Sequence, residues 1–150
     1  SIRKSQLKSP KFYFFDIGVR KSLARNAGEF SGPGTASFGE DFEQFLITEI
    51  FRWNEYSAAE YRMSFLCTKN DNEIDLVLSR GRHHIACEIK SADAVDIHEV
   101  KKLETLATDI KNCTQIFYLS RDPRRQQIGK VTCLFWRDFL DEVFHAKQGK

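Results

Sequence analysis

Three ionisable residues lie inside two short apolar segments of the sequence. Asp75 interrupts the run over 73–78, whereas Glu88 and Lys90 belong to the run over 85–90. Because side chains alternate across a strand, Glu88 and Lys90 share one face, and Asp75 joins them if the two strands are adjacent. Ionised groups inside a sheet are costly unless they are paired or bind a metal. These three residues therefore form the candidate site.

The chemistry of this residue set points to a divalent cation. Two carboxylates and one ammonium leave a net negative charge, and Mg²⁺ takes one or two carboxylates while leaving positions for water and a substrate phosphate. Lys90 would hold or polarise the attacking water and stabilise charge developing on phosphorus. Glu43, in the first turns of a predicted helix, would add a third carboxylate to the metal or its waters. The alternative is an ion pair between Lys90 and Glu88 or Asp75, with nothing bound.

The elements that must position these residues follow from the apolar spacing. Phe42, Phe45, Leu46 and Ile50 recur at helical spacing and predict a helix over 39–53 with acidic first turns. The other predicted elements are a meander of strands over 60–67, 73–78 and 84–90, a helix over 96–111, strands over 115–120 and 131–135 separated by a basic loop over 122–129, and a final helix over 136–145. This α-β-β-β-α-β-β-α order predicts an α/β fold, with a mixed sheet flanked by helices.

The N-terminal part of the chain carries its own predictions. Residues 1–10 are polar and basic, and we interpret them as a linker or the remnant of an upstream region. A strand is predicted over 11–15, a short helix over 19–27 and a loop over 30–38. We expect residues 11–150 to form a single domain, because 150 residues suffice for one compact domain but not for two.

The composition excludes several classes of protein. The 13 Phe, 4 Tyr and 2 Trp residues supply material for a core, which excludes a disordered chain. No segment approaches the ~20 apolar residues that a membrane span needs. Four cysteines without a C-x-x-C pair, and the lack of a signal peptide, predict reduced thiols. We therefore expect a cytoplasmic protein with no membrane partner.

Basic residues are clustered although the net charge is only +2. One cluster lies within residues 1–26, and a second contains Arg121, Arg124 and Arg125. Such clusters are compatible with a phosphate-rich partner such as DNA, and also with simply solvated faces. Arg62, beside the candidate site, would touch phosphate or form an ordinary salt bridge.

The candidate residues and the element order together resemble the PD-(D/E)XK nuclease superfamily. Its restriction-endonuclease-like core runs α-β-β-β-α-β, which residues 39–120 reproduce, and twelve residues separate Asp75 from Glu88. By this resemblance Asp75 and Glu88 would be metal ligands for Mg²⁺ or Mn²⁺. Lys90 would be catalytic, and Glu43 would be metal-associated.

A closer resemblance lies within that superfamily. The C-terminal nuclease-like domain of a prokaryotic AAA-type ATPase family is similar to this chain over 11–18, 39–43, 61–62, 73–75 and 88–91. The resemblance implies an upstream ATPase domain in a longer protein. The 150 residues contain no G-x-x-x-x-G-K-[ST] motif, so we assign no ATPase activity to them. Ile74 stands where the nuclease motif has proline.

The leading hypothesis is a divalent-metal-dependent nuclease domain that hydrolyses phosphodiester bonds in DNA. Lys90 and Glu43 would serve catalysis, and Asp75 and Glu88 would hold the metal. The alternative is a catalytically inactive nuclease-fold module that binds DNA or protein and regulates an attached AAA ATPase. A third reading is a purely structural domain with an ion pair between Glu88 and Lys90. A homodimer is compatible with the nuclease fold.

Overall fold

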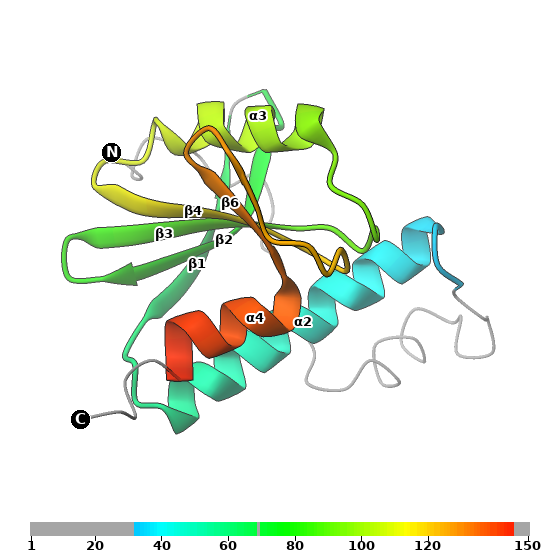
Figure 1. Ribbon diagram of the computed structural model, residues 1–150. Helices are drawn as coiled ribbons and strands as arrows, with labels where there is room; N and C mark the ends of the chain where they lie inside the picture. Colours follow the sequence, from blue (N-terminus) through cyan, green and yellow to red (C-terminus); the bar gives the residue numbers. More distant parts are fainter. Residues whose placement is uncertain (1–31, 69, 146–150) are drawn as a thin grey trace.

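The computed structural model describes residues 32–68 and 70–145, which form one mixed sheet with helices on both faces. The six strands lie in the order β1-β2-β3-β4-β6-β5. Helix α3 covers one face, and α2 and α4 lie side by side across the other (Figure 1). The predicted α/β class and the α-β-β-β-α-β core order are confirmed. The predictions for 1–10, 11–15 and 19–27 concern residues outside the described part.

Helix α2 spans Ala36–Tyr56 and is longer than predicted. The predicted loop over 30–38 is wrong for its last three residues. The helix begins earlier because the Thr35 side chain accepts a hydrogen bond from the backbone N–H of Phe38 at 3.1 Å, which caps the helix. Its apolar face, which includes Leu46 and Ile50, is buried against the sheet.

The predicted meander is confirmed as three antiparallel strands. They are β1 (Arg62–Cys67), β2 (Glu73–Arg80) and β3 (His83–Ile89). The hairpin between β2 and β3 is tighter than predicted, because Gly81 adopts a positive φ of 59° and lets the chain reverse quickly. Its register pairs Ser79 with His84 and Leu76 with Cys87, so the two candidate strands are adjacent.

The second half of the chain adds strands that continue the sheet. Helix α3 (Ile97–Ala107) is the crossover to β4 (Cys113–Ser120), which pairs in parallel with β3 on one side and with β6 (Val131–Phe135) on the other. Helix α4 (Trp136–Leu140) continues into a π-helical turn, η2 (Asp141–His145), so the predicted final helix over 136–145 is present.

One predicted loop contains a strand. Within the basic loop predicted over 122–129, β5 (Gln126–Ile128) pairs antiparallel with β6. The sequence pattern missed it because two of its three residues are glutamines, which lack the usual strand composition. Gly129, with a φ of 57°, closes the hairpin.

Two apolar cores sandwich the sheet. The core against α2 and α4 includes Leu76, Cys87 and Phe117, and the core against α3 includes Val77 and Ala86. This alternation fixes which face each polar strand residue occupies. Among the described residues, no helix is both long and apolar enough to cross a membrane.

Candidate metal site at the end of strands β2 and β3

Asp75 and Glu88 lie opposite each other where the regular pairing of β2 and β3 ends. The last register pair at this end joins Leu76 to Cys87, and one further step along both strands brings Asp75 opposite Glu88. Each lies two residues from a member of the α3-side core, so both carboxylates point to that face. Both are buried, with exposed fractions of 9% and 8%. The structure thus brings together the two carboxylates that the alternation pattern singled out.

The Asp75 carboxylate also bridges the two strands. Its Oδ2 accepts a hydrogen bond from the backbone N–H of Ile89 at 2.8 Å. A side chain therefore connects β2 to β3 beyond the end of their paired segment. This contact orients the carboxylate and ties its position to the backbone of the segment that carries Glu88 and Lys90.

Lys90 lies between two carboxylates from different elements. Its Nζ is 3.0 Å from Oε1 of Glu88 and 3.3 Å from Oε2 of Glu99, which belongs to the first turn of α3. Burial by itself would lower the pKa of Lys90, but Glu88, Glu99 and Asp75 raise it well above its ordinary value. The ammonium is therefore fully charged at neutral pH.

The second oxygen of Glu88 is the least satisfied polar atom in this arrangement. Glu88 Oε2 is buried and, within residues 32–68 and 70–145, has no hydrogen-bond partner. Burial raises the pKa of Glu88, and the neighbouring Lys90 lowers it in part. A buried acceptor without a partner carries an uncompensated desolvation cost. A hard cation prefers carboxylate oxygens as ligands. Such a cation would supply the partner that Glu88 Oε2 lacks among the described residues.

Among the described residues, the candidate donor set consists of these two carboxylates. Over the part of the chain that the structure describes, no group of three or more His, Cys, Asp or Glu side chains is arranged to hold a metal ion. Two carboxylates with added waters are a sufficient protein contribution for Mg²⁺ or Mn²⁺, which keep several waters. Asp75 and Glu88 thus fit such an ion, without a third acidic ligand.

Glu43 lies on α2, which covers the face of the sheet opposite to α3. It is half-buried on α2, four residues after Gly39, and so lies on the same side of that helix. A Cβ placed on Gly39 would lie 3.7 Å from Oγ of Ser91, just after Lys90. The Glu43 face of α2 is thus directed toward the end of β3, and a role for Glu43 at the metal stays a prediction.

Arg121 is the predicted DNA-binding residue that lies next to the site. Its Nη1 donates to the backbone carbonyl of Ser91 at 3.2 Å, and its guanidinium lies over the Phe38 ring at 5.3 Å. The Arg121 backbone N–H also donates to Ala92 at 2.9 Å. These contacts join the ends of β3, β4 and α2.

The other predicted arginines lie elsewhere. Arg124 and Arg125 follow β4, and Arg125 forms an ion pair with Glu142 at 2.8 Å. Arg62 is exposed on the edge strand β1 and pairs with Ser79. Ser79 is four residues beyond Asp75 along β2, a separation of about 13 Å at ~3.3 Å per residue. Arg62 is therefore not brought to the site.

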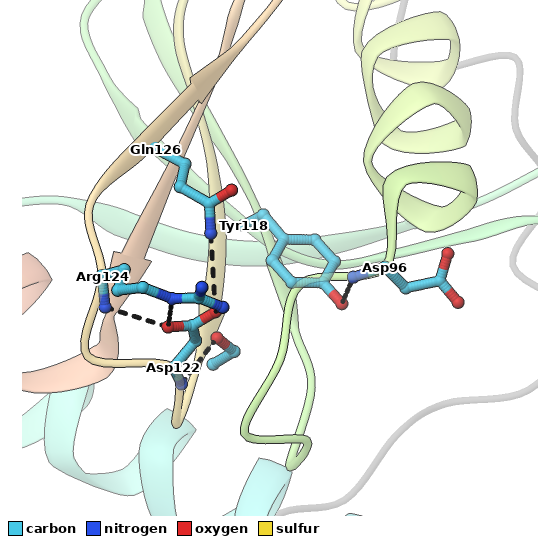
Figure 2. Close-up of polar contacts among 6 residues, drawn as sticks. Asp96, Tyr118, Asp122, Arg124 and Gln126 are labelled. Atoms are coloured by element: carbon cyan, nitrogen blue, oxygen red, sulfur yellow. Dashed lines mark hydrogen bonds and ion pairs between the residues drawn. The ribbon is translucent and has the colours of Figure 1, made fainter.

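Arg124 is held by Asp122 (Figure 2). The buried Asp122 carboxylate accepts bonds from Nε and Nη2 of Arg124, at 3.0 and 2.9 Å, and from its backbone N–H at 3.0 Å. These hydrogen bonds lower the pKa of Asp122 to about 2. Gln126 also donates to this carboxylate at 3.5 Å. Arg124 thus organises the β4–β5 connection, and a contact with DNA stays a prediction.

Sequence reasoning missed Glu99 as a neighbour of the site. The signal that was present is local: Asp96 and Glu99 have the spacing of a helix capping box. That pattern predicts a helix start, and the Asp96 side chain does cap α3 by accepting from the His98 backbone N–H at 2.8 Å. It does not reveal that Glu99 contacts a lysine on the neighbouring sheet.

Fold and site together define a mixed α/β domain with two buried carboxylates and a charged lysine at one end of its sheet. The model of the family described as Domain of unknown function (DUF4143) matches residues 38–138, and the chain belongs to this family. In prokaryotes this domain is often the C-terminal domain of AAA ATPase-associated proteins. A search of curated proteins found no match. The matched segment includes Glu43, Asp75, Glu88 and Lys90.

Proposed function

We propose that this domain is a divalent-metal-dependent deoxyribonuclease, in which Asp75 and Glu88 hold Mg²⁺ or Mn²⁺. The observation that carries the proposal is the buried Oε2 of Glu88, which has no hydrogen-bond partner among the described residues. It lies beside a second buried carboxylate and a lysine. Bound there, the cation would polarise a phosphoryl oxygen and lower the pKa of a water molecule.

Lys90 would act as a fixed positive charge and not as a base. In the metal-free protein the neighbouring carboxylates raise its pKa above the ordinary value, and the side chain carries a positive charge. An ammonium has three donors and no acceptor, and therefore can orient a water molecule or stabilise negative charge on a phosphate oxygen. Its side chain is 36% exposed, so it is reachable by a substrate from outside.

Arg121, next to the site, suggests how a DNA strand would be held. Arg121 binds the Ser91 carbonyl through Nη1 and is half-buried at the end of β4. A guanidinium carries five donors, so others are available to a phosphate. Because the family is often the C-terminal domain of AAA ATPase-associated proteins, we also propose an ATPase domain as the partner that delivers DNA.

The inactive module is a second candidate, and one observation favours it. Lys90 is already paired with both Glu88 and Glu99, so its charge is compensated without a metal or a phosphate, as expected for the inactive module and also for the purely structural domain. Such a module would bind DNA or protein and regulate an attached ATPase. It predicts that purified protein leaves DNA intact whatever metal is added.

A nicking assay separates the two candidates. Supercoiled plasmid is incubated with wild type, Glu88→Gln and Asp109→Asn, each with Mn²⁺ or with EDTA. Asp109 is exposed after α3, so Asp109→Asn makes the same change of charge far from the candidate residues. The proposal predicts Mn²⁺-dependent nicking by wild type and Asp109→Asn and none by Glu88→Gln. Equal nicking by all three proteins, or none by wild type, would contradict it.

A further inference from the structure

We propose that Glu99 is a positioning residue that keeps the Lys90 ammonium in the site when the Glu88 carboxylate binds a divalent cation. This role rests on the proposed function. It is suggested by the bridging position of Lys90 Nζ, 3.0 Å from Glu88 and 3.3 Å from Glu99. The two carboxylates come from different elements, Glu88 from β3 and Glu99 from α3.

Glu99 does not close a capping box, although its spacing from Asp96 offers it that role. In a capping box, the acidic residue at the third helical position reaches back to the backbone N–H of the cap residue. Here the Asp96 backbone N–H donates to the hydroxyl of Tyr118 at 3.5 Å, as Figure 2 shows. The Glu99 carboxylate instead contacts Lys90. Tyr118 thus accepts the hydrogen bond from the Asp96 N–H that a capping box would assign to Glu99.

Hydrogen bonds at the start of α3 hold Glu99 in position. Asp96 Oδ1 accepts hydrogen bonds from the backbone N–H groups of His98 and Glu99, at 2.8 and 3.4 Å, which fixes the first turn of α3. Tyr118 is buried on β4 directly beside Glu88 in the strand register. The tyrosine therefore links the start of the helix to the part of the sheet that carries the candidate site.

A cation bound at Glu88 would change the electrostatic surroundings of the Lys90 ammonium. A divalent cation on Glu88 repels the nearby ammonium and removes the negative charge that holds it. Lysine has a long flexible side chain and a strongly hydrated head group, and Lys90 is already partly exposed. Without another anchor, its ammonium would leave for solvent. Glu99 is not one of the two candidate metal ligands, so its carboxylate can still hold the ammonium when the cation is bound.

The test follows the Lys90 ammonium itself by ¹H–¹⁵N NMR of lysine side chains. Spectra of wild type, Glu99→Gln and Asp109→Asn are recorded without metal and with Mg²⁺, and the Lys90 signal is assigned with Lys90→Arg. We expect a protected Lys90 signal in all three metal-free proteins, because Glu88 still holds it. With Mg²⁺ the signal should persist in wild type and Asp109→Asn and disappear from Glu99→Gln.

Binding and cleavage are measured on the same proteins. We expect Glu99→Gln to bind Mg²⁺ within about threefold of wild type and to nick plasmid on the order of 10–100-fold more slowly, the usual loss for an outer partner of a metal site. An unchanged nicking rate, or a Lys90 signal that Mg²⁺ affects equally in wild type and Glu99→Gln, overturns the role of Glu99 alone. If wild type binds no Mg²⁺, the proposed function fails and the role falls with it.

Discussion

The carboxylate of Asp75 accepts a hydrogen bond from the backbone N–H of Ile89, 2.8 Å away on the neighbouring strand. Regular pairing of β2 and β3 ends just before this point, at Leu76 and Cys87. One side chain therefore both connects two strands and presents a carboxylate beside Glu88. Its structural and chemical roles can be separated by the choice of substitution.

Asp75→Asn and Asp75→Ala should differ in stability. Alanine leaves the buried Ile89 N–H without its acceptor, which should lower the free energy of unfolding by about 1–3 kcal/mol. The asparagine carbonyl can still accept that bond, so Asp75→Asn should cost less than Asp75→Ala. Urea unfolding followed by circular dichroism measures both. Equal losses for the two variants would show that this hydrogen bond does not stabilise the fold.

Gly129→Ala should destabilise the domain more than Gly81→Ala. Both glycines have a positive φ, 57° and 59°, which costs about 1–2 kcal/mol for a residue with a Cβ. A Cβ on Gly129 would also lie 2.5 Å from Oε1 of Glu104, whereas one on Gly81 meets nothing within 4 Å. Glu104 in turn accepts from the Lys130 backbone N–H at 2.6 Å.

The matched glycine variants isolate that contact. Thermal unfolding of both, compared with wild type, should give the larger drop in Tm for Gly129→Ala. A drop of the same size in both would mean that the Glu104 carboxylate moves aside at no cost.

Asp122 should make stability depend on pH in the acid range. Hydrogen bonds from Arg124 lower its pKa from 3.8 to about 2, so the folded protein binds this proton less readily than the unfolded chain does. The resulting stabilisation is present above about pH 3.8 and is lost as the pH falls through about 2. Asp122→Asn lacks it at every pH.

Urea unfolding of wild type and Asp122→Asn over a range of pH tests this assignment. The difference in free energy of unfolding should be largest near neutral pH and should narrow as the solution is made more acidic. A difference that stays constant down to the acid limit would assign the effect of the substitution to lost packing instead of the Arg124 ion pair.

Arg121→Gln should weaken DNA binding in a salt-dependent way. If Arg121 contacts one phosphate, its loss should reduce the slope of log affinity against log salt by about 1. Arg62→Gln is the matched control, because Arg62 on β1 pairs with Ser79, toward the end of β2 that is distant from Asp75. Fluorescence anisotropy with a labelled duplex at several salt concentrations measures both slopes. The same slope for Arg121→Gln and wild type would exclude a phosphate contact at this residue.

The sequence predicted the strand residues of the site better than their surroundings. Alternation within a strand follows from backbone geometry, so Glu88 and Lys90 could be placed on one face from the sequence alone. Asp75 joined them only on the expectation that the two strands are adjacent, which the pairing of β2 and β3 confirms. Glu99 could not, because its contact with Lys90 depends on how α3 packs across the sheet. Its sequence neighbourhood indicates only a helix start.

The element boundaries show the same limit. Thr35 is a good capping residue, but the glycines and proline before it favour a loop, and the start of α2 was predicted too late. The strand over Gln126–Ile128 exists because β6 offers it an edge, as the antiparallel pairing shows. Such elements are set by tertiary pairing more than by their own composition.

The most direct test of the metal site is calorimetric titration with Mn²⁺ of wild type, Asp75→Asn and Asp109→Asn. Asparagine can keep the hydrogen bond from Ile89, so Asp75→Asn removes charge from the site without removing the acceptor. We predict one binding event for wild type and Asp109→Asn that is lost in folded Asp75→Asn. Equal heats for wild type and Asp75→Asn, or none for wild type, would contradict a metal site formed by Asp75 and Glu88.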